Sequence, residues 1–112
     1  MEITRVSDVE PGKNPHGVDA RMIYNHENAS VTIITLESGE RLRRHMTPVD
    51  VFFYVLNGTG IIEIGEERKI VGPDTIIHSP AKIVHCWYNE SDKPLRVLVA
   101  KTPRQKEQTV IL

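Results

Sequence analysis

The spacing of turn residues is the feature that most limits what this chain can fold into. Short runs rich in Val, Ile, Tyr and Phe alternate with Gly, Pro, Asn and Asp about every eight to twelve residues. This spacing predicts an all-β chain with strands over residues 19–25, 30–39, 51–58, 59–65, 68–72, 74–80, 82–89 and 95–103. Their short links are suited to hairpins, so we expect a closed or double-sheet antiparallel structure that leaves few exposed edges.

Length and composition exclude several classes of protein. A chain of 112 residues is one domain, which we place over residues 1–112, and its single cysteine, Cys86, cannot form an internal disulfide. The net charge of −1 argues against a nucleic-acid partner. The longest apolar run, Val51 to Leu56, is far shorter than the roughly 20 residues that span a bilayer, and the first residues lack an apolar signal segment. We expect a soluble cytoplasmic protein.

Two patterns predict contacts beyond a lone barrel. The run Val51 to Leu56 is apolar at odd and even positions alike, so both faces of that strand should be covered. One face would line the barrel, and the other would pack on a second sheet or on a second subunit. Because the chain has few residues with which to cover both faces, we predict a homodimer. The apolar end of the chain, Val110 to Leu112, is expected to pack on the barrel or on a neighbouring subunit.

Two spaced motifs carry a family resemblance, one over residues 39–58 and one over residues 74–89. The matching positions are Gly39, His45 and Gly58 in the first motif and Pro80, His85 and Asn89 in the second. In these motifs the chain resembles the cupin superfamily. The resemblance implies a single-domain jelly-roll barrel (a double-stranded β-helix), with the flanking strands completing the same fold.

The ligand positions of the family are only partly present. The resemblance implies three histidines and a glutamate around a divalent metal, but Thr47 stands at the second histidine and Val51 at the glutamate. His45 and His85 are therefore the two candidate metal ligands. Because catalytic metal sites want three protein ligands, Asp50 or His78 would have to complete the site. The implied metal is Zn, Fe, Ni, Mn or Cu, and its presence stays open.

Five further residues are candidates for the wall of a ligand pocket. Arg41 and Arg43 share strand parity with His45, and an arginine fork recognises carboxylate or phosphate, so the ligand would be a small anion. Thr47, Phe53 and Trp87 are the candidate wall residues. Simpler readings compete with these, namely a solvated edge strand for the arginines, core packing for the tryptophan and a backbone hydrogen bond for His78.

Two functions follow from these residues and stay open. The first is a small-molecule-binding cupin whose pocket holds His45 and His85, and which is a divalent-metal-dependent enzyme of dioxygenase, isomerase or decarboxylase type where a metal is bound. The second is a non-catalytic, metal-free barrel that binds a sugar or a small organic acid. The sequence does not identify the substrate, because sites are placed on such barrels independently of the scaffold.

Overall fold

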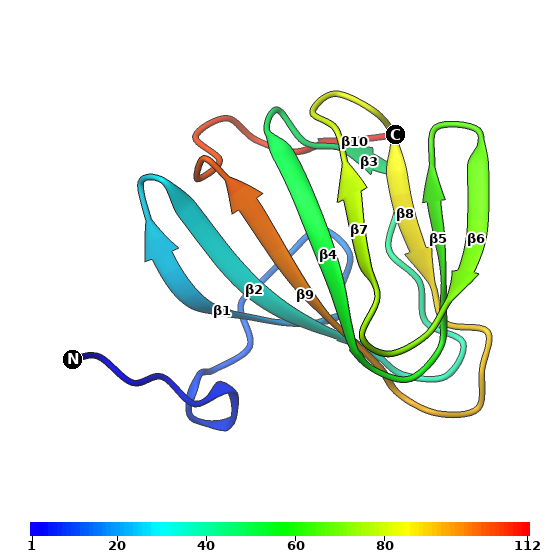
Figure 1. Cartoon of the computed structure of the whole chain (residues 1–112), viewed down its shortest axis with the longest axis horizontal. Helices are drawn as coiled ribbons and strands as arrows, with labels where there is room; N and C mark the ends of the chain where they lie inside the picture. Colours follow the sequence, from blue (N-terminus) through cyan, green and yellow to red (C-terminus); the bar gives the residue numbers. More distant parts are fainter.

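The computed structural model describes residues 1–112 as two antiparallel sheets of five strands each (Figure 1). One sheet has the order β1-β2-β9-β4-β7 and the other β10-β3-β8-β5-β6. The sheets come together at one end of the molecule and splay apart at the other, where β3 and β10 lie (Figure 1). The strands are β1 (Asp19–His26), β2 (Ala29–Leu36), β3 (His45–Met46), β4 (Asp50–Asn57), β5 (Gly60–Ile64), β6 (Glu67–Val71), β7 (Ile76–Ser79), β8 (His85–Tyr88), β9 (Leu95–Thr102) and β10 (Val110–Ile111).

The all-β prediction is confirmed, and each of the eight predicted strands overlaps an observed one. The chain also forms β3 and β10, which the sequence pattern did not predict because each is only two residues long. The one helical element is a 3-10 turn at Val6–Asp8, so no helix of this chain is long enough to cross a membrane.

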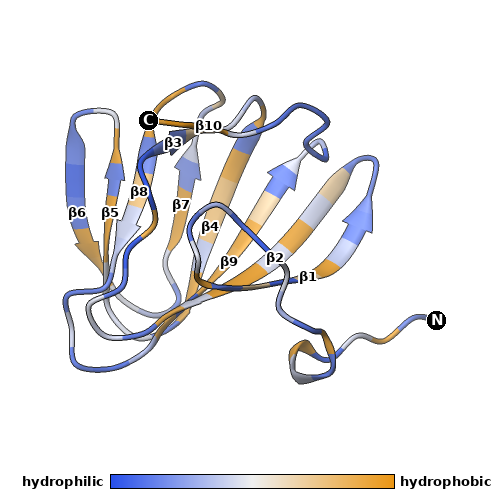
Figure 2. Cartoon of the chain, turned by 180° about the vertical axis from the view of Figure 1, so that it is seen from behind, coloured by the Kyte–Doolittle hydropathy of each residue, from blue (hydrophilic) through white to orange (hydrophobic).

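The core lies between the two sheets because apolar residues alternate toward the interior. On β4 the odd positions Val51, Phe53 and Val55 are buried, and on β9 so are Leu95 and Val97. Hydrophobic colour runs along β2, β4 and β9 (Figure 2). Burial of such side chains stabilises the fold by roughly 1.5–3 kcal/mol each.

Two motif positions have structural roles. Gly58 has a φ of 85°, and a Cβ there would collide with the carbonyl oxygen of Pro94, so the β4–β5 turn requires glycine. The buried Asn89 donates from Nδ2 to the carbonyl oxygens of Leu36 and Lys93, at 2.9 and 2.8 Å. These residues hold the loops at the closed end of the sheets and contribute no group to a site.

The even positions of β4 and the chain terminus are covered only in part. Phe52, Tyr54 and Leu56 are half-buried in the single chain, so the predicted homodimer stays a prediction. At the terminus Val110 and Ile111 pair with Met46 and His45 of β3, and Ile111 is half-buried, whereas Val110 and Leu112 are 50% and 59% exposed. The expected packing of the tail on the barrel therefore holds within the chain only for Ile111.

Candidate functional site

A cavity of about 910 Å³ lies against the inner face of the first sheet. Its walls come from β1, β2, β4 and β9, from His45 of β3 and His85 of β8, and from two irregular segments. One segment is residues 12–18, before β1, and the other is residues 104–109, between β9 and β10. The cavity is thus bounded by rigid strands on one side and by loops on the other.

His45 and His85 form a direct pair in the lining of this cavity. The two residues stand opposite each other where β3 pairs with β8, and their Nε2 atoms are 2.9 Å apart. Their exposed fractions are 7% and 2%. The edge of the Phe53 ring packs against His85, with ring centroids 5.3 Å apart. The two imidazoles therefore meet inside the barrel, as the sequence predicted.

The hydrogen bonds of the two Nδ1 atoms determine which ring nitrogens of the pair carry protons. Nδ1 of His45 is 2.7 Å from the carbonyl oxygen of Arg43, which only accepts, so this nitrogen carries a hydrogen. Nε2 of a neutral His45 then accepts, and Nε2 of His85 donates to it. Nδ1 of His85 in turn accepts from the hydroxyl of the buried Ser79, at 2.6 Å. With both rings neutral, each of the four ring nitrogens of His45 and His85 has a hydrogen-bond partner.

Both rings are neutral near pH 7 because burial disfavours their charged forms. Burial, followed by repulsion from His45 where that ring is protonated and from Lys101, lowers the pKa of His85 from 6.5 to about 3. Burial also lowers the pKa of His45, against the opposing effect of its hydrogen bond to Arg43. The pair therefore presents imidazole groups and no imidazolium to the cavity.

A third histidine, His16, joins the pair from the loop before β1. Its ring centroid is 4.5 Å from that of His45, and its Nδ1 accepts a 2.9 Å hydrogen bond from the backbone N–H of Arg43. Burial, then the neighbouring His45, lowers the pKa of His16 to about 4. Asn14 shapes this loop by accepting from the backbone N–H of His16 at 3.1 Å. Sequence reasoning gave His16 no function, because it lies in a turn-rich segment.

Residues 32–101 match the sequence model of the cupin domain, which is more than half of the chain. The chain belongs to the cupin family. A relative, an uncharacterized protein of Streptomyces coelicolor, is 24% identical over 103 residues, which covers 92% of this chain and 97% of that protein.

Two solved structures illustrate how widely this cupin fold is shared. The crystal structure of TT1209 from Thermus thermophilus has a TM-score of 0.78 and 26% identity, and the match covers 92% of this chain and 98% of that one. The polyketide cyclase RemF from Streptomyces resistomycificus has a TM-score of 0.85 at 17% identity, over 100% of this chain and 85% of its own. The second likeness shows the fold alone.

The histidines of the cavity supply only part of the metal centre that the family implies. His45 and His85 suit ligation, since each Nε2 faces the other and each Nδ1 is held by a hydrogen bond. No group of three His, Cys, Asp or Glu side chains is arranged to hold a metal ion. Nδ1 of His16 is occupied by the Arg43 N–H, which leaves its proton on Nε2. The residues present do not fit a centre with three protein ligands.

The two residues predicted to complete a metal site lie away from the pair. His78 is exposed on β7, opposite Phe52 of β4. Asp50 is also exposed, and its Oδ1 accepts the backbone N–H of Ala81 at 2.8 Å. At the family's other ligand positions, Thr47 and Val51 are buried in the cavity wall, and the Thr47 hydroxyl donates to the carbonyl oxygen of Val49.

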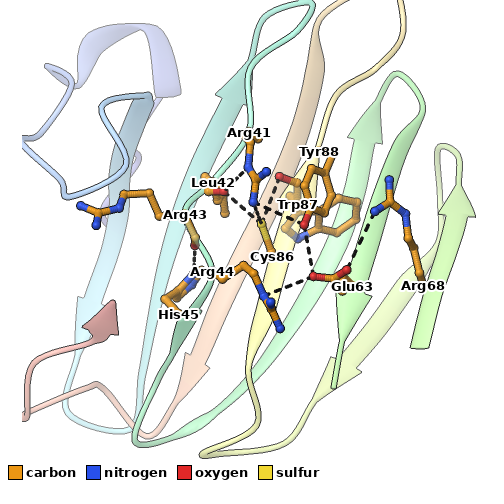
Figure 3. A network of polar contacts seen from close by, with 10 residues as sticks. All are labelled: Arg41, Leu42, Arg43, Arg44, His45, Glu63, Arg68, Cys86, Trp87 and Tyr88. Atoms are coloured by element: carbon orange, nitrogen blue, oxygen red, sulfur yellow. Dashed lines mark hydrogen bonds and ion pairs between the residues drawn. The ribbon is translucent and has the colours of Figure 1, made fainter. Parts of the chain in front are cut away.

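The predicted wall residues divide between cavity, core and surface. Thr47 and Phe53 line the cavity. Trp87 is fully buried behind Phe53, with ring centroids 5.5 Å apart, and does not line it. Arg41 lies on the opposite face of β8, where it stacks over Tyr88, and the side chain of Arg43 points away from His45 (Figure 3).

The placement of the two arginines corrects the parity argument. Residues 42–44 form no strand, so the alternation that a continuous strand would keep is lost between Arg41 and His45. Leu42 and His45, which differ in parity, both line the cavity as a result. Arg43 contributes its backbone instead, with a carbonyl to His45 and an N–H to His16.

The basic groups of the cavity come from other residues. Its lining holds Lys13, Lys101, Arg104 and Lys106, against one carboxylate, Glu107. Sequence reasoning missed all of these. Lys101 carried a usable signal, because it follows Leu95, Val97 and Val99 at the two-residue spacing of an inward-facing strand. The others lie in irregular segments, where no periodicity predicts the direction of a side chain.

Proposed function

We propose that this cupin binds a small organic anion in the cavity between its sheets and does so without a resident metal. The observation that carries this proposal is the charge of the cavity lining, with four lysine or arginine side chains against one glutamate. Such an excess inside a concave surface raises the local concentration of anions and favours their carboxylate or phosphate groups.

Arg104 is the side chain best placed to fix an anionic group. It is half-buried, and its guanidinium makes one hydrogen bond, to Oδ1 of Asn25 at 3.3 Å, and no ion pair. Its backbone N–H is bound to the carbonyl oxygen of Glu27, which anchors it beside the β1–β2 hairpin. A guanidinium with free donors and a fixed backbone is suited to bidentate binding of a carboxylate.

The three histidines supply neutral hydrogen-bonding groups to the same ligand. His16 Nε2 carries a proton and makes no hydrogen bond within the chain, so it is free to donate to a ligand oxygen. The ring nitrogens of His45 and His85 already have hydrogen-bond partners within the chain, so this pair presents an uncharged surface to the ligand. A ligand with one anionic end and one neutral polar group would match the guanidinium of Arg104 and the neutral histidines of this cavity.

A metal-dependent enzyme is the second candidate, favoured by the convergence of the His45 and His85 Nε2 atoms. Elemental mass spectrometry on protein purified without a histidine tag separates the two candidates. Our proposal expects metal far below one equivalent, with no difference between the wild type and the His45→Ala and His85→Ala variants. Metal near one equivalent that is lost in both variants would make the two histidines ligands and replace our proposal.

Anion binding is tested by calorimetric titration with lactate, succinate and glucose. We expect the two carboxylates to bind and the neutral sugar not to bind. The Arg104→Gln variant should weaken carboxylate binding about tenfold, which corresponds to roughly 1.4 kcal/mol. Arg68→Gln, on the opposite face of the second sheet, is the matched control and should leave the affinity unchanged. Equal binding of glucose, or no effect of Arg104→Gln, would contradict the proposal.

A further inference from the structure

Lys101 is the one lysine of this chain that is not exposed. The other five are exposed, including Lys13 and Lys106 of the cavity lining, whereas Lys101 is half-buried at the end of the inward-facing row of β9 and lines the cavity together with Val99. Its backbone is held on both sides, since it stands opposite Ser30 of β2 and Val51 of β4. The side chain is thus carried by a central strand of the sheet and not by a mobile loop.

The surroundings of the Lys101 amine disfavour its charged form. Nζ donates one hydrogen bond, to Oε1 of Gln105 at 2.8 Å, and forms no ion pair. The titratable groups that it influences within the cavity are the histidines 16, 45 and 85, none of which is an anion. Burial lowers the pKa of Lys101 below its usual value.

An amine in such surroundings differs in reactivity from a surface lysine. Each unit by which its pKa falls gives about tenfold more neutral amine at a fixed pH near 7. The neutral amine is the nucleophile in lysine chemistry, and desolvation or neighbouring positive charge activates it. Lys101 combines burial, the lack of a carboxylate partner and an approach from the cavity that a small molecule can take.

We propose that Lys101 is a nucleophile that forms a Schiff base with a small carboxylic acid bearing an aldehyde or ketone. This inference rests on the proposed function, since it gives the anionic ligand a carbonyl group and the cavity a covalent step. Arg104 receives the carboxylate, and the carbonyl carbon lies toward Nζ of Lys101. Both side chains line the same cavity and come from one segment of the chain, at the end of β9 and just after it.

The covalent step balances without any further reactant. The lone pair of Nζ forms a C–N bond with the carbonyl carbon while the C=O π electrons move to the oxygen. A proton passes from nitrogen to that oxygen to give a carbinolamine. The carbinolamine then loses water, whose two hydrogens both come from the amine, as the nitrogen lone pair forms the C=N bond. Nothing is oxidised or reduced.

Trapping with pyruvate and sodium cyanoborohydride at pH 7 tests the proposal. The hydride reduces the C=N bond to a stable secondary amine, which intact mass and peptide mapping locate. We expect one adduct per chain, on Lys101, formed at least about tenfold faster than on any exposed lysine. Lys101→Arg keeps the positive charge and should lose the adduct, whereas Lys69→Arg, at an exposed position, should keep it.

Formaldehyde with cyanoborohydride is a second probe that does not depend on the fit of pyruvate. Lys101 should again be methylated ahead of the exposed lysines. Labelling of Lys101 at the rate of Lys69 would overturn the proposal, and preferential methylation without a pyruvate adduct would overturn the assignment of a carbonyl acid. Lactate, which has no reactive carbonyl, separates this inference from the proposed function. Lactate binding without trapping overturns the inference alone, and no binding of lactate overturns both.

Discussion

The two faces of β8 carry two polar networks of opposite character. On the inner face, His85 belongs to a neutral chain of hydrogen bonds that runs from Ser79 through His45 to the Arg43 carbonyl. On the outer face, Tyr88 lies in an ionic network with arginine and glutamate side chains (Figure 3). The two networks are built on alternate residues of one four-residue strand.

The outer network is charged and reached by solvent. The Tyr88 hydroxyl donates to Oε1 of Glu63 at 3.1 Å, and the guanidinium groups of Arg41 and Arg68 lie 4.4 and 4.7 Å from the Tyr88 ring centroid. Arg44 and Arg68 pair with Glu63 at 3.5 and 3.9 Å, and about half of each arginine side chain is exposed. Such contacts are screened by water and salt.

The difference shows that burial decides how much the loss of one polar contact costs on each face. The arginines of the outer network are half in water and can exchange partners with it, so the loss of one of their contacts costs little. The inner groups cannot, because a buried donor or acceptor without a partner costs roughly 1–3 kcal/mol. The inner network is therefore the fragile one, and it is also the one that faces the cavity.

The largest expected effect comes from His85→Ala. This change removes a fully buried ring, leaves a cavity beside Phe53 and leaves the Ser79 hydroxyl and His45 Nε2 without partners. We expect the free energy of unfolding to fall by about 3 kcal/mol. Urea denaturation at pH 7 measures it.

His78→Ala is the matched control for His85→Ala. His78 is a histidine on β7, the strand that precedes β8 in the chain, but it is exposed. We expect its removal to change the free energy of unfolding by less than about 0.5 kcal/mol. Similar losses in the two variants would mean that the inner network gives the fold no particular support.

The sequence predicted the frame of this molecule and the His45–His85 pair for different reasons. Alternation and turn residues located the eight main strands, because these signals are local. The pair was predicted from motif spacing alone, and β3 is too short to have indicated that His45 faces His85. A family pattern thus supplied a contact that strand periodicity could not.

The parts of the site that sequence reasoning missed lie where strand parity fails or ends. His16 and Arg104 sit in segments without regular structure, so only folding brings them to the cavity. Arg41 was placed in the pocket by parity, but the irregular residues after it put it on the other face. Strand parity could have predicted that Lys101 faces the cavity, because β9 is a continuous strand.

The next largest effect is a dependence of stability on pH that comes from the inner network. Folding lowers the pKa of His85 to about 3 and of His16 to about 4, whereas an unfolded histidine titrates near 6.5. The unfolded chain therefore binds more protons below pH 6.5, and the folded state loses stability as the pH falls from there toward 4. Each of these histidines contributes at most roughly 1.4 kcal/mol per pH unit.

Urea denaturation at pH 7, 6 and 5 checks this dependence. His85→Gln is the informative variant, because an amide still forms hydrogen bonds but does not titrate. Its stability should fall less steeply between pH 6 and 5 than that of the wild type. Carboxylate groups contribute equally to both proteins, so the difference in slope belongs to His85. Equal slopes would mean that His85 is not held neutral by the fold.

The smallest expected effect comes from Glu63→Gln in the outer network. The change removes the charge that Arg44 and Arg68 share but leaves an oxygen that accepts from Tyr88. We expect a loss of less than about 1 kcal/mol at low salt, because both arginines are half in water.

That loss should shrink further at roughly 1 M NaCl, where the Debye length is only about 3 Å. The His85→Ala loss should hardly change with salt, because its buried, neutral contacts are not screened. A large, salt-insensitive effect of Glu63→Gln would contradict the contrast between the two faces. It would place the outer network among the contacts that the fold requires.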